Sequence, residues 1–145
     1  MHITTTKGDI GVAKVTADLL EKGLQVLVPT AASVAYDLVI YDGSKYFKAQ
    51  VKYRTKNSSG ILQVELRRTT MNNRKKMRRT FLTLKDVDII AVYCPDTREC
   101  YYFLMTNLKV RTMSLRIDPT KNNQAKSVLW AKNYTNFPTK KIIAG

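Results

Sequence analysis

The stretch "YFKAQVKYRTK", residues 46–56, has the alternating pattern of a β-strand with two unlike faces. Read with a period of two, one face is an ordinary apolar core face made of Phe47, Ala49, Val51 and Tyr53. The other face is strongly polar and carries Tyr46, Lys48, Gln50, Lys52 and Arg54. This strand therefore anchors the core on one side and, by holding an amide next to a lysine, indicates a site for chemistry on the other.

The segment before this strand, "YDLVIYDG" at residues 36–43, is predicted to be a second strand that ends in a hairpin turn. Asp42-Gly43 is a favourable pair for a tight turn, so we expect the two strands to be antiparallel neighbours. Residues on neighbouring strands lie within side-chain reach of each other. If Asp37 points to the polar face, the hairpin brings it close to Gln50 and Lys52.

The whole sequence, residues 1–145, predicts a single α/β domain with a mixed sheet, in which helix and strands alternate with turn signals. Residues 8–22 read as a helix that ends at Gly23. Its expected apolar stripe consists of Ile10, Ala13, Ala17 and Leu20, widened by Val12, Val15 and Leu19. Further strands are expected at residues 24–29, 61–67, 86–94, 100–105 and 114–117. The C-terminal segment is expected to close the core as a helix or loops, using Trp130, Tyr134 and Phe137.

Charge is the strongest clue in the composition. The 145 residues include 25 Lys and Arg against 11 Asp and Glu, which gives a formal net charge of +14. A polyanionic partner would relieve this self-repulsion, and nucleic acid is the first candidate. An anionic membrane surface is the second candidate, but no clear basic amphipathic helix favours it.

Several kinds of site and location are disfavoured. His2 is the only histidine, so the sequence offers no zinc site and no Ser-His or Cys-His nucleophile within a folded core. No apolar run reaches the about 18 residues of a membrane span, and we expect a cytoplasmic protein with no membrane partner. Cys94 and Cys100 flank a turn and could face each other across a hairpin, but reduced thiols are expected in the cytoplasm.

Residues 67–79, "RRTTMNNRKKMRR", form a second candidate functional segment. They contain seven basic residues and no acid, with little helical apolar period, and we interpret them as a basic DNA-binding loop. Basic side chains contact phosphates, and Arg can also read guanine edges. The candidate DNA-binding residues are Arg54, Arg67, Arg68, Arg74, Lys75, Lys76, Arg78 and Arg79. A solvated run of charges is the alternative.

An acid, an amide oxygen and a lysine on adjacent strands suit metal-dependent hydrolysis of a phosphodiester. Asp37 supplies a carboxylate and Gln50 a neutral oxygen, and both are hard ligands of the kind that Mg²⁺ prefers. Lys52 can hold the attacking water or the scissile phosphate while negative charge builds up. The alternative is a solvated strand face on which Gln and Lys alternate without any chemistry.

Four segments, "KGDIGVAKVTADLLEKG", "VLVP", "YDLVIYDG" and "FKAQVKYR", resemble the PD-(D/E)xK nuclease superfamily in their order and spacing. The resemblance is greatest to the branch with Gln in its second motif, "D…QxK", and there to the group I intron-encoded homing endonucleases of cyanobacteria. It covers residues 7–68 well and the remainder loosely. It implies a restriction-endonuclease-like core, with a mixed central sheet and flanking helices. It also implies that Asp37 is the metal-binding acid, that Gln50 replaces the second acid and that Lys52 is the catalytic lysine.

The first helix departs from the family pattern. The family often has a glutamate there, in a pattern such as "G-E-A", whereas this sequence reads "GVA" with Val12 at that position. Asp9, one helical turn earlier, could partly substitute or could cap the helix.

These observations together predict a Mg²⁺-dependent, site-specific double-stranded DNA endonuclease of the homing type. A long duplex site needs more surface than one chain offers, so a homo-oligomer, either a dimer or a tetramer, is expected. A restriction-like or junction-resolving nuclease is one alternative. A basic nucleic-acid-binding module without catalysis is the other.

Overall fold

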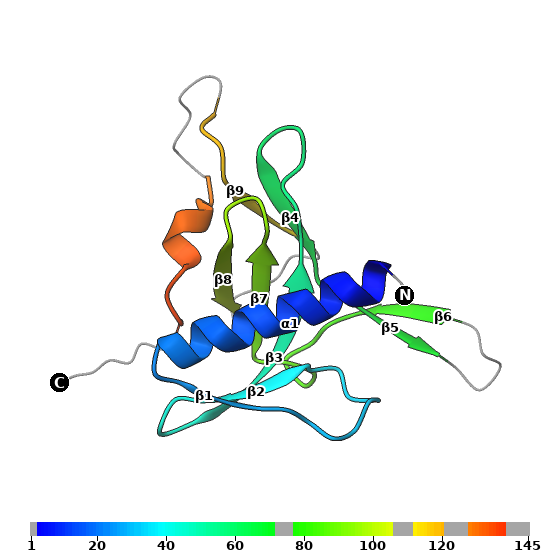
Figure 1. Ribbon diagram of the computed structural model, residues 1–145. Coiled ribbons are helices and arrows are strands. Elements are labelled where there is room, and N and C mark those ends of the chain that lie inside the picture. Colours follow the sequence, from blue (N-terminus) through cyan, green and yellow to red (C-terminus); the bar gives the residue numbers. More distant parts are fainter. Residues whose placement is uncertain (1–2, 72–76, 106–111, 121–127, 139–145) are drawn as a thin grey trace.

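A five-stranded sheet lies at the centre of the protein. The computed structural model describes residues 3–71, 77–105, 112–120 and 128–138, and the strand order in its central sheet is β1-β2-β3-β7-β8 (Figure 1). The five strands are Gln25–Leu27, Leu38–Tyr41, Tyr46–Tyr53, Ile89–Cys94 and Glu99–Leu104. β3 and β7 are parallel and the other neighbours are antiparallel, so the sheet is mixed, as predicted.

The β2–β3 hairpin confirms the predicted turn. Leu38 lies opposite Ala49, which sets the register of the two strands. In the turn, the Asp42 carboxylate accepts hydrogen bonds from the backbone N–H groups two and three residues later, at 2.8 and 2.7 Å. Gly43 has a φ of 98°, a conformation that suits glycine and strains most other residues. The turn therefore fixes the register that brings Asp37 to β3.

β3 obtains its second neighbour from far along the chain. β4 (Ile61–Glu65) follows β3 after a turn, but it pairs with β9 (Thr112–Arg116) in a separate antiparallel sheet. The other edge of β3 is occupied by β7, in parallel register. A parallel pair needs a long crossover connection, and residues 54–88 provide it.

Two apolar clusters cover the two faces of the central sheet. The helix α1 (Ile3–Glu21) lies across one face, and its Val15 and Leu19 are fully buried there (Figure 1). β4, β9 and the 3₁₀ helix η2 (Ala131–Tyr134) supply the cluster on the other face. Tyr134 packs against this second cluster and Phe137 against the helix-side cluster, so these two predicted residues do close the core. Trp130, in contrast, is half-buried and lies under the Lys132 ammonium.

The buried side of α1 is rotated from the predicted stripe. The predicted core positions that turn out to be exposed are Ile10, Ala13, Ala17 and Leu20. Gly11 is buried instead, and a Cβ added to it would lie 3.5 Å from side-chain atoms of Val51 and Tyr53. The stripe was displaced because apolar periodicity gives no weight to a glycine at which a helix approaches a strand. Gly23, with a φ of 82°, confirms the predicted end of the helix.

Asp18 links α1 to the edge strand β8. Its carboxylate accepts a 2.5 Å hydrogen bond from the hydroxyl of Tyr102 and forms a 2.9 Å ion pair with Lys22. The Lys22 ammonium also lies over the Tyr102 ring. Burial, together with the hydrogen bond to Asp18, raises the pKa of Tyr102.

The two cysteines point to opposite faces of the sheet. Cys94 lies opposite Glu99 and Cys100 lies opposite Tyr93, so the two thiols enter different apolar clusters. Both are free, as expected for reduced thiols, but the predicted possibility that they face each other is wrong. Burial raises the pKa of the Cys100 thiol to about 11, so this thiol is a structural one.

The two ends of the basic segment are β-strands that pair as a ribbon, so the prediction of a loop is wrong there. β5 (Arg67–Met71) pairs antiparallel with β6 (Met77–Phe81), and this ribbon projects away from the central sheet (Figure 1). Leu66 and Leu82 anchor its base in the second apolar cluster, where the Leu82 N–H donates to the Leu66 carbonyl at 3.0 Å. The sequence hides these strands because no alternating apolar residues mark them.

Candidate active site

The carboxylate of Asp37 is fixed against β3. The Asp37 N–H donates to the Ala49 carbonyl at 2.8 Å, and one carboxylate oxygen accepts the Val51 N–H at 2.7 Å. Asp37 is exposed as a residue, but its carboxyl group leans on the strand and is partly withdrawn from water. This desolvation raises its pKa, whereas the Val51 hydrogen bond and the charge of Lys52 act in the opposite direction. The predicted approach of Asp37 to the strand that carries Gln50 and Lys52, β3, is therefore observed.

The side chain of Gln50 is fixed through its nitrogen and buries its oxygen. Its Nε2 donates to the Ala35 carbonyl at 3.1 Å, which fixes the amide on the loop before β2. Its Oε1 is buried and accepts no hydrogen bond from any residue that the structure describes. Such an acceptor costs about 1–3 kcal/mol when it stays unsatisfied. A hard cation would satisfy it, because neutral carbonyl oxygens are among the ligands of such ions.

Lys52 is half-buried between the sheet and the base of the ribbon. Its ammonium donates to the backbone carbonyl of Arg67 at 3.4 Å. The pKa of Lys52 is lowered to about 8, first by burial and then by the charge of Arg54, while the carboxylates of Asp37 and Glu65 oppose this shift. A lysine perturbed by burial and by named charges is typical of functional sites.

Few charged groups of the candidate site are available to hold a metal ion. The Asp37 carboxylate and the Gln50 Oε1 are hard oxygens, the chemistry that a cation such as Mg²⁺ prefers. Within the described ranges, no group of three or more His, Cys, Asp or Glu side chains is placed to hold a metal ion. Asp37 and Gln50 together supply one carboxylate and one neutral oxygen.

The first helix packs against the apolar face of β3, and position 12 carries no acid. Val12 is half-buried in the helix-side cluster, in which Val51 and Tyr53 also pack. Val12 therefore does widen the apolar stripe of the helix, as predicted. Asp9 is exposed on the helix.

The other basic residues of the prediction are placed in part. Lys48 shares the face of Gln50, but its ammonium donates to the Lys85 carbonyl at 2.7 Å. Arg54 is half-buried and donates to the Tyr53 carbonyl at 2.8 Å, while Arg67 is exposed at the base of the ribbon. The side chains of Arg68, Arg78 and Arg79 on β5 and β6, and all of Arg74, Lys75 and Lys76, lie outside the described residues.

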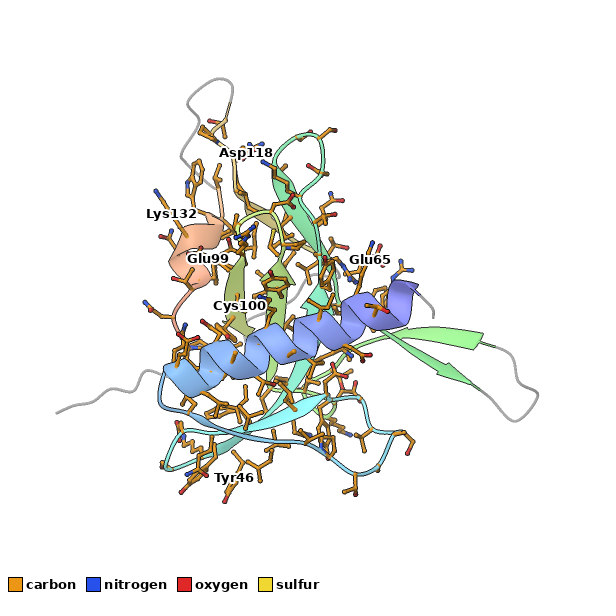
Figure 2. The ribbon with its side chains drawn as sticks, viewed as in Figure 1. Tyr46, Glu65, Glu99, Cys100, Asp118 and Lys132 are labelled. Carbon is orange, nitrogen blue, oxygen red and sulfur yellow. The ribbon has the colours of Figure 1, made fainter. Side chains whose placement is uncertain are left out.

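Glu65 is a neighbour of the site that the sequence prediction missed. It ends β4, and its Oε2 lies 3.6 Å from the Nε of Arg67. Figure 2 labels its side chain close to the point where the chain leaves the body for the ribbon. The signal in the sequence is its position two residues before Arg67, because such residues share a face in an extended chain.

Comparisons with known proteins identify a family and a similar fold. The sequence model of the PD-(D/E)XK endonucleases matches residues 2–137. The fold is similar to that of a bacterial homing endonuclease, I-Ssp6803I, with a TM-score of 0.70 and 22% sequence identity over 92% of this chain and 88% of that chain. No match is found among curated proteins. In the part of the chain that the structure describes, no helix is long and apolar enough to cross a membrane.

Proposed function

The chain belongs to the PD-(D/E)XK endonuclease family, and from this premise we propose that it is a Mg²⁺-dependent, site-specific endonuclease of the homing type that cuts double-stranded DNA. Similarity of fold to a homing endonuclease supports the homing type. The net charge of +14 supports a polyanionic substrate.

The observation that supports this proposal best is that Asp37, directly before β2, lies beside β3, the strand that carries Gln50 and Lys52. We assign Asp37 and Gln50 to hold the metal. When bound, a divalent metal would offset charge on the phosphate and lower the pKa of the attacking water. The Val51 N–H keeps the Asp37 carboxylate in one orientation. Lys52 aims a half-buried ammonium at the negative charge that grows on the scissile phosphate.

We assign DNA docking to the β5–β6 ribbon and its basic residues. Residues 67–79 carry seven positive charges and no acid, and the ribbon stands clear of the sheet (Figure 1). Each charge that reaches a phosphate releases counterions and strengthens binding. One chain offers one site, so cutting both strands calls for a homo-oligomer, a dimer or a tetramer.

A DNA-binding protein without catalysis is the second candidate. It is favoured by Val12, which leaves Asp37 as the one carboxylate assigned to the metal.

The test compares Lys52→Met with Lys45→Met, a control that removes the same charge from the exposed hairpin turn. Wild type and the control are expected to cut target-bearing plasmid at discrete sites with Mg²⁺ but not with EDTA. Lys52→Met should cut at least about 100-fold more slowly while its DNA affinity stays within about threefold. Equal losses of binding and cutting in Lys52→Met would make Lys52 a docking residue. DNA binding by wild type without any cut would favour the second candidate.

A further inference from the structure

The base of the ribbon holds a charged pair that the proposed cleavage does not use. The Oε2 of Glu65 lies 3.6 Å from the Nε of Arg67, and the two side chains are 56% and 42% exposed. The Arg67 guanidinium also lies over the ring of Phe81, the residue opposite it on β6, at 5.4 Å. Two partners therefore hold this guanidinium at the first rung of the ribbon.

The backbone of Arg67 contacts the candidate site. Its carbonyl accepts the 3.4 Å hydrogen bond from the Lys52 ammonium. Leu66, the preceding residue, is 2% exposed, so the chain is anchored in the core at this point. A phosphate held by Lys52 would consequently lie within reach of the Arg67 side chain.

We propose that Glu65 is a positioning residue that occupies Arg67 in place of a DNA phosphate, and that a phosphate arriving beside Lys52 displaces it. A carboxylate and a phosphate both attract a guanidinium by their negative charge, so they compete for Arg67. The inference rests on the proposed function, because it takes the phosphate to be that of DNA.

The competition makes docking selective for position. DNA that touches only the outer part of the ribbon leaves the Glu65–Arg67 pair intact. DNA that reaches Lys52 exchanges the pair for a phosphate contact, which leaves the negative charge of Glu65 close to the Lys52 ammonium. An exposed ion pair changes an equilibrium by about 1.5- to fivefold, so the expected effect on affinity is of that size.

The test is a double-mutant cycle in DNA binding, measured by fluorescence anisotropy on a labelled target duplex in EDTA, where no cutting occurs. The variants are Glu65→Gln, Arg67→Gln and both together, with Glu65→Asp as the conservative variant. Glu99→Gln is the matched control, because it removes the same charge from an exposed position on β8. Melting temperatures check that every variant folds, which the exposure of both side chains favours.

Glu65→Gln is expected to tighten binding about two- to fivefold more than Glu99→Gln does, with Glu65→Asp close to wild type. In the Arg67→Gln background this excess should vanish, because Glu65 then has no guanidinium to withhold. An excess that persists without Arg67, or an effect equal to that of Glu99→Gln, would overturn the inference. Because the cycle needs no cleavage, coupling without cutting would refute only the proposed activity, and cutting without coupling would refute only the role of Glu65.

Discussion

At the scale of single residues, Gln50 limits the negative charge of the proposed metal site, because its side-chain oxygen is neutral. Its Oε1 is buried and has no hydrogen-bond partner among the residues that the structure describes, while Asp37 brings the one carboxylate assigned to the metal. A neutral oxygen attracts Mg²⁺ less strongly than a carboxylate does, because it brings no charge. Metal affinity is therefore the property most open to change by one substitution.

Val12→Glu tests whether the first helix can supply a second carboxylate. Val12 is half-buried in the helix-side cluster, so a glutamate there should lower the melting temperature in EDTA. If the carboxylate reaches the metal, adding Mg²⁺ should raise the melting temperature of Val12→Glu by about 3 °C more than it raises that of wild type. Cleavage by Val12→Glu should then also be faster than cleavage by wild type. Differential scanning fluorimetry at several Mg²⁺ concentrations measures this response.

The control for this prediction is Ala13→Glu, because Ala13 is exposed at the next position of the helix. It should melt like wild type and show no added response to Mg²⁺. A Val12→Glu protein that melts early and ignores Mg²⁺ would show that position 12 does not reach the site. Asp9 would then be the next residue to test.

On the scale of elements, the contact between α1 and β8 depends on Tyr102. Tyr102→Phe removes the hydrogen bond to Asp18 and should cost about 1–2 kcal/mol of unfolding free energy at neutral pH. Burial and then the hydrogen bond to Asp18 raise the pKa of Tyr102 in the folded state, so the stability that neutral Tyr102 contributes is full below about pH 10 and is lost as the pH rises further. Wild type should therefore lose more stability than Tyr102→Phe above about pH 10.

Urea unfolding at a series of pH values measures that difference. Tyr46→Phe is the control, since Tyr46 is 64% exposed. If wild type and Tyr102→Phe lose stability in parallel through the alkaline range, folding does not raise the pKa of Tyr102.

The basic charge of the ribbon predicts how DNA binding depends on salt concentration. Replacing Arg74, Lys75 and Arg78 together by Ala should weaken DNA binding and flatten its log-log salt dependence by about one unit per lost phosphate contact. The matched control replaces Lys7, Lys45 and Lys85, which are exposed elsewhere. Binding titrations at four or more salt concentrations distinguish the two triples. Equal slopes in both would mean that the ribbon is not the docking element.

The sequence predicted those elements whose pattern is local. The Asp42-Gly43 turn fixed one hairpin, the turn after Cys94 fixed another, and both are present. Nothing local shows that β4 leaves β3 to join β9, because that choice depends on packing against the second apolar cluster. At the site, the approach of Asp37 to Gln50 and Lys52 was predictable because one local hairpin brings the three residues together. Glu65 is brought in only by the route of the chain into the ribbon.

For the whole molecule, charge and symmetry act against each other. Copies that each carry +14 repel, while two-strand cleavage calls for at least two of them. We therefore expect sedimentation velocity to report a dimer or a tetramer, favoured by added salt or by bound duplex, which screen or neutralise that charge. A monomer that cuts both strands with full specificity would contradict this prediction.

The parallel pairing of β3 with β7 also affects folding during synthesis on the ribosome. α1 and the first three strands lie within residues 3–53, so the Asp37 anchor can form early in synthesis. The open edge of β3 must wait for β7, which ends at Cys94, and at about 5–20 residues per second this takes about 2–8 seconds. An unpaired strand edge invites pairing with another nascent chain. The stretch translated in that interval includes the basic run, whose like charges would keep unfinished chains apart.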